Sequence, residues 1–71
     1  MKEKLIRYWE RKEHQIELYP ERKTTFLSQA FGALEFATEM LNNWDEEAEL
    51  IDLWNDEWKV RLEEKVYGKM Y

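Results

Sequence analysis

The sequence predicts an all-α protein, a three-helix bundle built on an antiparallel helical hairpin. The 71 residues include only two glycines and one proline, and Lys, Glu, Leu and Ala, which favour helices, are abundant. Apolar residues recur at helical spacing in three segments. The breaks between the segments are short, so consecutive helices are expected to pack side by side. A chain of this length predicts one helical domain, residues 1–71.

The first predicted helix covers residues 2–18. Pro20 ends it, because proline removes a backbone donor and disfavours helical geometry in the residue before it. Residues 14–19 alternate in polarity, so an extended conformation there remains an alternative. The aliphatic stem of Lys12 fills a gap in the apolar side of this helix. The other residues of that side are Met1, Leu5, Tyr8, Trp9, Ile16 and Tyr19.

The second predicted helix covers residues 25–41, with the hydroxyl of Thr24 or Thr25 as its N-cap. Its polar stripe is narrow and consists of Ser28, Gly32, Glu35 and Glu39. Because the remaining surface is almost entirely apolar, this helix is expected to be covered on more than one side. We therefore expect it to be the central element of the bundle.

The third predicted helix covers residues 44–66, after a break at Asn42 and Asn43. Asn43 followed by Glu46 is typical of a capping box, and acidic residues fill the first turn, where the helix dipole favours them. Gly68 is expected to end the helix as an αL cap. The main apolar stripe contains Ile51, Trp54, Trp58 and Leu62, flanked by Leu50 and Val66.

A chain this short is only marginally able to stabilise itself, which favours self-association. It contains no cysteine, so disulfides and thiolate–zinc sites are excluded. Several apolar or small residues lie outside the main stripes, and we predict that Gly32, Phe36, Leu53 and Val60 form a homodimer interface. Gly32 has two open explanations: close packing within the bundle, or close packing against a second copy. An alternative architecture is a hairpin whose first helix swings out to embrace a second copy.

The net charge of −5 is distributed unevenly along the chain. Residues 1–23 hold seven basic and five acidic side chains, whereas residues 24–71 hold four basic and eleven acidic ones. An acidic surface repels the phosphate backbone, so direct nucleic-acid binding is disfavoured. An acidic face formed by Asp45, Glu46, Glu49, Asp52 and Asp56 has two interpretations. It is either a solvated surface or a surface that imitates the phosphates of DNA.

No constellation of residues predicts catalysis, a cofactor or a metal site. His14 is the only histidine, and with Glu10 and Glu17 it offers too few ligands on a polar helix face. Glu35 and Glu39 are interpreted as the solvent-facing edge of the second helix. No apolar run resembles a signal peptide or a membrane span, so we expect a cytoplasmic protein without a membrane partner.

These observations together predict a small acidic protein-interaction module that associates with itself and possibly with another protein. In bulk composition the chain resembles short acidic proteins of Gram-positive bacteria and their phages. That resemblance rests on composition alone and assigns no role to any residue. The alternative function is an inhibitor of a nucleic-acid-handling protein, acting through a DNA-mimicking helix face at residues 45–57.

Overall fold

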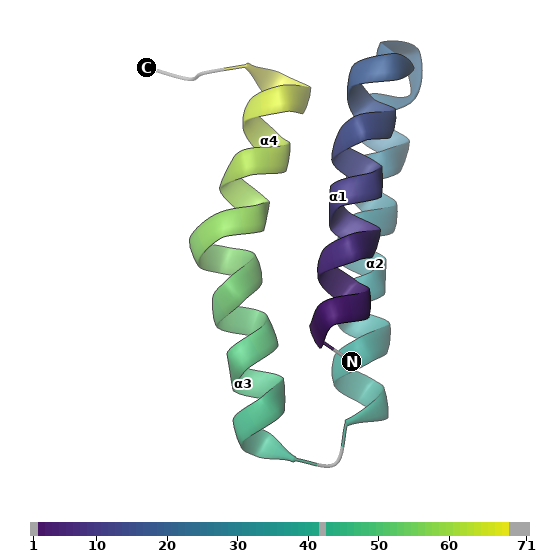
Figure 1. The fold of residues 1–71 in the computed structure, drawn as a ribbon. Coiled ribbons are helices and arrows are strands. Elements are labelled where there is room, and N and C mark those ends of the chain that lie inside the picture. The colour runs from purple at the N-terminus through teal and green to yellow at the C-terminus, as the bar shows by residue number, and fades with distance from the viewer. Residues whose placement is uncertain (1, 42, 69–71) are drawn as a thin grey trace.

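The computed structural model describes residues 2–41 and 43–68, and Figure 1 shows them as helical rods lying side by side. No strand occurs in these two ranges, which confirms the all-α prediction. The predicted roles of Met1 and Asn42 lie outside the described residues. The elements are α1 (Lys2–Leu18), the 3-10 turn η1 (Pro20–Arg22), α2 (Lys23–Met40), α3 (Trp44–Leu53), the π-helical segment η2 (Trp54–Trp58) and α4 (Lys59–Tyr67). The last three elements are continuous and are called the third rod.

The connection from α1 to α2 is a tight turn around Pro20. Helix α1 continues to Leu18, so the extended alternative for residues 14–18 is wrong, and only Tyr19 leaves helical geometry (φ −129°, ψ 70°). Proline disfavours helical geometry in the residue before it, which accounts for the end of α1 at this point. Pro20 then opens η1, which leads directly into α2 at Lys23.

Helix α2 therefore begins two residues before the predicted position, and the predicted threonine cap is wrong. Arg22 occupies the N-cap position and makes no side-chain capping bond. Thr24 and Thr25 already lie inside the helix, where a residue lacks the extended geometry that an N-cap needs. The turn η1 thus replaces a side-chain cap at this helix start.

Both ends of the third rod carry the residues that the sequence predicts. The side-chain oxygen of Asn43 accepts hydrogen bonds from the backbone N–H groups of Asp45 (2.8 Å) and Glu46 (3.4 Å). At the other end the Gly68 N–H donates to the Glu64 carbonyl at 2.8 Å. Gly68 has φ 79° and ψ 176°, so its positive φ is as expected but its ψ lies outside the αL region of the predicted cap.

The third rod contains a π turn that the sequence analysis does not predict. Its buried residues follow each other at a strict spacing of four: Leu50, Trp54, Trp58, Leu62 and Val66. In an uninterrupted α-helix four such steps would rotate the stripe by about 160°. In η2 the Lys59 N–H donates to the Trp54 carbonyl, five residues back, which absorbs one extra residue and about 100° of that rotation. The π turn therefore keeps the stripe directed at the core.

The core is built around Trp9, which is fully buried. The Trp9 indole N–H donates to the Ala30 carbonyl of α2 at 3.0 Å. Its ring lies 5.1 Å from the ring of Trp54 and 5.9 Å from that of Trp58, centroid to centroid. A single side chain of α1 thus contacts both α2 and the third rod.

Helix α2 contacts both α1 and the third rod, as expected of a helix covered on more than one side, and it leaves part of its apolar surface exposed in the single chain. It buries Ala30, Leu34 and Ala37. It exposes Phe31 and Phe36 to 48 % and 66 % of their surface. The small residues face inward because the Trp9 indole lies against Ala30 and leaves little room there for a larger side chain.

The caps can be tested by substitution. We expect Asn43→Ala to lower the free energy of unfolding by about 1 kcal/mol, because two backbone donors lose their acceptor. Thr24→Ala and Thr25→Ala serve as controls and should change it by less than about 0.5 kcal/mol. The measurement is urea unfolding followed by far-ultraviolet circular dichroism. A threonine variant as costly as Asn43→Ala would contradict the turn geometry described here.

Candidate interaction surfaces

The outward half of α2 carries exposed phenylalanine and methionine side chains beside two carboxylates, Glu35 and Glu39. We define the α2 outer face by Ser28, Phe31, Gly32, Phe36 and Met40, all of which are exposed. The whole of α2 carries only three charged side chains, Lys23, Glu35 and Glu39. Glu35 and Glu39 are exposed as expected. They lie in the same stripe as Ser28 and Gly32, between Phe31 and Phe36, so the α2 outer face is of mixed polarity.

Gly32 has no packing role within the described part of the chain. A Cβ atom built at Gly32 would have no neighbouring atom within 4 Å. A glycine inside a helix costs up to about 1 kcal/mol relative to alanine. Close packing within the bundle is therefore excluded for the described residues, and close packing against a second copy stays a prediction.

The four residues predicted as an interface do not form one surface. Gly32 and Phe36 lie one turn apart on the α2 outer face. Leu53 belongs to α3 and is partly buried against the core, whereas Val60 belongs to α4 and is half exposed. Residues seven apart share a face of an α-helix, but the π turn between Leu53 and Val60 adds a residue and separates them.

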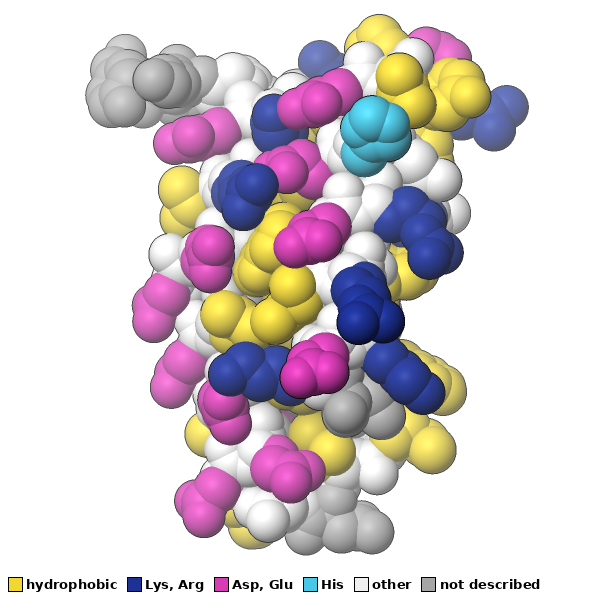
Figure 2. All heavy atoms as spheres, viewed as in Figure 1, with side chains coloured by type: hydrophobic (Ala, Val, Ile, Leu, Met, Phe, Trp, Pro, Cys, Tyr) yellow, Lys and Arg dark blue, Asp and Glu magenta, His cyan; other side chains and the backbone are white. Residues whose placement is uncertain are grey.

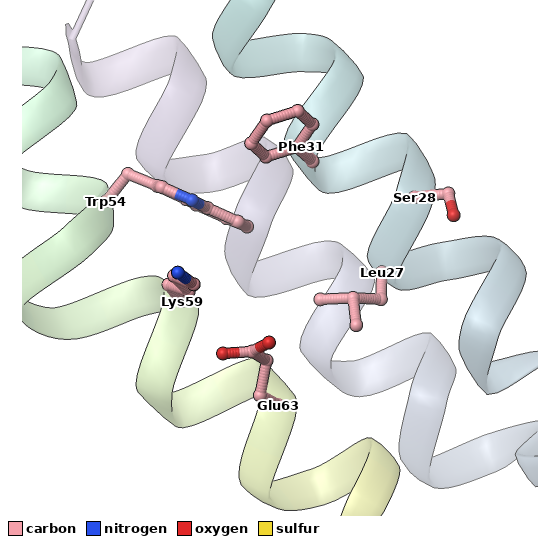
Figure 3. A pocket seen from close by; sticks show the side chains of 6 residues that line it. All are labelled: Leu27, Ser28, Phe31, Trp54, Lys59 and Glu63. Carbon is pink, nitrogen blue, oxygen red and sulfur yellow. The ribbon is translucent and has the colours of Figure 1, made fainter.

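A groove adjoins the α2 outer face, and sequence reasoning did not predict it. Leu27, Ser28 and Phe31 line it from α2, and Trp54, Lys59 and Glu63 line it from the third rod (Figure 3). Its volume is about 340 Å³. The rings of Phe31 and Trp54 lie 6.1 Å apart. Phe31 directly follows Ala30, which faces the core, and this was the only sign of the groove in the sequence. It could be used only once the side of α2 that faces the core was known.

The predicted acidic face is exposed along its whole length. All five of its residues lie at the surface of α3 and η2, and Figure 2 shows acidic side chains along the edge of the third rod. Asp45, Glu49, Asp52 and Asp56 follow at steps of four, three and four, which places them on one helical stripe. Glu49 is bound by the Lys2 ammonium of α1 at 2.5 Å.

Ion pairs join α1 to the third rod along one seam. Besides Lys2 with Glu49, they are Glu13 with Arg61 and Glu17 with Lys65. Arg61 also lies over the Trp58 ring, with its guanidinium carbon 4.7 Å from the ring centroid. The hydrogen bond from Lys65 lowers the pKa of Glu17, and the same bond raises the pKa of Lys65. Because these ion pairs are largely exposed, each contributes little to the free energy of unfolding. Their main effect is on how α1 lies against the third rod.

The side chain of Lys12 is almost completely buried, with 9 % of its surface exposed. The sequence predicted a contact for its aliphatic stem alone. Its ammonium donates to the Gln29 side-chain oxygen at 2.7 Å. It lies 4.9 Å from the Tyr8 ring centroid and 5.4 Å from that of Phe26. Burial lowers the pKa of Lys12, and neighbouring Arg11 adds to this effect. The arrangement joins α1 to α2 opposite the ion-pair seam.

His14 is exposed, and its neighbour Glu17 is already paired with Lys65. Within residues 2–41 and 43–68 no group of three or more His, Cys, Asp or Glu side chains is placed to hold a metal ion. In the same residues no helix is both long enough and apolar enough to cross a membrane.

The Glu17–Lys65 ion pair is expected to make the stability of the protein depend on pH. Because the pKa of Glu17 is lowered, its contribution to stability is present above the unfolded-state pKa and is lost as pH falls through the folded-state value. We expect Lys65→Gln to return the pKa of Glu17 towards its ordinary value, as measured by NMR titration of the Glu17 carboxyl carbon. Lys59→Gln, on the same helix, should leave it unchanged. An unaltered titration in Lys65→Gln would show that the pair does not form.

No family model, no curated protein and no solved structure matches this chain. The functional argument therefore rests on the chemistry of its own surfaces.

Proposed function

We propose that this chain is a protein-interaction module that associates with itself as a homodimer through the α2 outer face. The observation that supports it most is that α2 leaves Phe31, Phe36 and Met40 exposed while Ala30, Leu34 and Ala37 face the core. A helix of a self-sufficient bundle turns its large apolar side chains inward. The exposure of Phe31, Phe36 and Met40 is the pattern expected of a helix whose apolar side chains are covered by a second molecule.

The energetics favour such an association. Burying one phenylalanine or methionine side chain contributes about 1.5–3 kcal/mol, so two copies would gain from several of them at once. A standard interface buries about 800 Å² on each partner, which is about 15 % of the 5345 Å² surface of this chain. Domains of this size commonly depend on such an additional source of stability.

Charge also favours the α2 outer face over the rest of the surface. Each copy carries a net charge of −5, so two copies repel each other over most approaches. The acidic stripe and the ion-pair seam lie on α1 and the third rod. Contact through α2 brings together the least charged surfaces and keeps the acidic ones in water.

We expect Phe36→Glu combined with Met40→Glu to convert a dimer into a monomer, because the new charges would be desolvated in the interface. Sedimentation equilibrium at tens of micromolar measures the mass, and circular dichroism checks that the helices persist. Leu18→Glu, which places the same charge at an exposed apolar residue of α1, should leave the dimer intact. A monomer mass for the unmodified chain would rule out the proposed homodimer.

A second candidate function rests on the acidic face. Asp45, Glu49, Asp52 and Asp56 lie on one exposed helical stripe, so their carboxylates are ordered along the rod and not scattered. A basic DNA-binding groove would be attracted to such a stripe. In this function the chain inhibits a nucleic-acid-handling protein by occupying that groove.

We expect Asp45→Lys, Asp52→Lys and Asp56→Lys together to abolish capture of a basic partner that duplex DNA also displaces. Glu49 is left unchanged because it already binds Lys2. Reversal of Glu3, Glu10 and Glu64, which changes the net charge equally at other exposed sites, is the matched control and should preserve capture. The measurement is affinity capture from the native host with duplex DNA as competitor. Equal loss in both triple variants would mean that net charge alone matters.

A further inference from the structure

The groove between α2 and the third rod contains a hydrogen-bond donor that the chain itself does not use. Trp54 is only 3 % exposed, but among the described residues its indole N–H has no acceptor, whereas that of Trp9 bonds to Ala30. Within residues 2–41 and 43–68 the one enclosed side-chain atom without a partner is Gln15 Oε1, so the Trp54 N–H is open to solvent. Figure 3 shows the indole in the groove, between Phe31 and the third rod. The donor is therefore available to a bound molecule.

The π turn brings two charged side chains to the same groove. Its hydrogen bond joins Lys59 to Trp54, five residues earlier, and in an uninterrupted α-helix these two residues would lie about 140° apart around the axis. The π turn removes about 100° of this angle, so Lys59 lies on the Trp54 side of the rod. Glu63 follows Lys59 by one helical turn and is half-buried. In the described part of the chain neither Lys59 nor Glu63 forms an ion pair.

The remaining wall of the groove is largely apolar. Leu27 and Phe31 line it from α2, and the Phe31 ring lies 6.1 Å from that of Trp54. The volume of about 340 Å³ falls within the range of small-molecule sites, about 300–1,000 Å³, which combine apolar walls with a few orienting polar groups. We propose that this groove binds a small aromatic zwitterion, a molecule of the same chemical class as a free aromatic amino acid.

Each part of such a molecule has a counterpart in the groove. Its carboxylate accepts from the Trp54 N–H and the Lys59 ammonium, and its ammonium donates to Glu63. Its ring packs beside Phe31. A simple anion would face Glu63 without a compensating donor, and the net charge of −5 would repel it. A simple cation would leave both donors unused, so the groove favours a ligand that carries both charges and no net charge.

The groove is complete within one chain, so this inference goes beyond the proposed homodimer and does not rest on it. Phe36 and Met40 do not line the groove. We therefore expect the chain that carries both Phe36→Glu and Met40→Glu to bind the zwitterion as a monomer. Loss of the dimer and loss of ligand binding are separate results.

The test is a titration of isotope-labelled chain with free L-phenylalanine, followed by nitrogen–proton NMR of the indole N–H groups. We expect the Trp54 resonance to shift downfield and to saturate at millimolar ligand, because this N–H gains an acceptor. The resonances of Trp9, which is already bonded to Ala30, and of Trp44, which is 85 % exposed, should hardly move. No shift of Trp54, or an equal shift of Trp44, would overturn the inference.

Matched ligands and variants test the two charges separately. Phenethylamine, which lacks the carboxylate, and phenylpropionate, which lacks the ammonium, should bind about tenfold more weakly, because each loses a charge-assisted hydrogen bond. Lys59→Gln and Glu63→Gln should weaken L-phenylalanine binding to a similar extent. Glu64→Gln, at an exposed carboxylate outside the groove, is the control and should leave it unchanged. Either single-charge compound binding as tightly as L-phenylalanine would overturn the zwitterionic ligand.

Discussion

The buried indole of Trp9 is the contact on which the rest of the structure depends. It lies between both other rods, donates its N–H to the Ala30 carbonyl and packs against Trp54 and Trp58. A side chain of this volume fits only where the facing helix is small, and α2 presents alanines there. The spacing of the tryptophans on the third rod in turn requires the π turn that keeps them directed at the core. Packing around one residue thus sets the orientation of all the rods.

The same contact determines which surface of the molecule stays apolar. Because α2 turns Ala30, Leu34 and Ala37 towards the core, Phe31, Phe36 and Met40 remain exposed, whereas Phe26 packs against the core. The charged side chains concentrate elsewhere: ion pairs connect α1 to the third rod, and carboxylates line the outside of α3. The chain therefore separates its ion pairs and acidic stripe, on α1 and the third rod, from the exposed Phe31, Phe36 and Met40 of α2, which lie beside Glu35 and Glu39. That separation is the physical basis of the self-association proposed for it.

The sequence predicts the elements well because periodicity and capping are local properties. The range of α1, the Asn43 cap and the tryptophan stripe of the third rod all follow from residues close in sequence. The outward side of α2 follows from its polar stripe, in which Glu35 and Glu39 are exposed as predicted, whereas the exposure of Phe31, Phe36 and Met40 beside that stripe does not follow. The π turn was missed although the spacing of four from Leu50 to Val66 was visible in the sequence. The π turn lies between Leu53 and Val60, and the groove beside Phe31 was not foreseen either.

The central claim is that a second copy covers the large side chains that α2 turns outward. Isotope-filtered nuclear Overhauser spectroscopy on an equal mixture of labelled and unlabelled chains detects contacts between copies alone. The account predicts cross-copy signals from the Phe36 ring and the Met40 methyl group to α2 of the other copy. Cross-copy signals confined to α1 or α4, or none at concentrations where the chain remains folded, would contradict it.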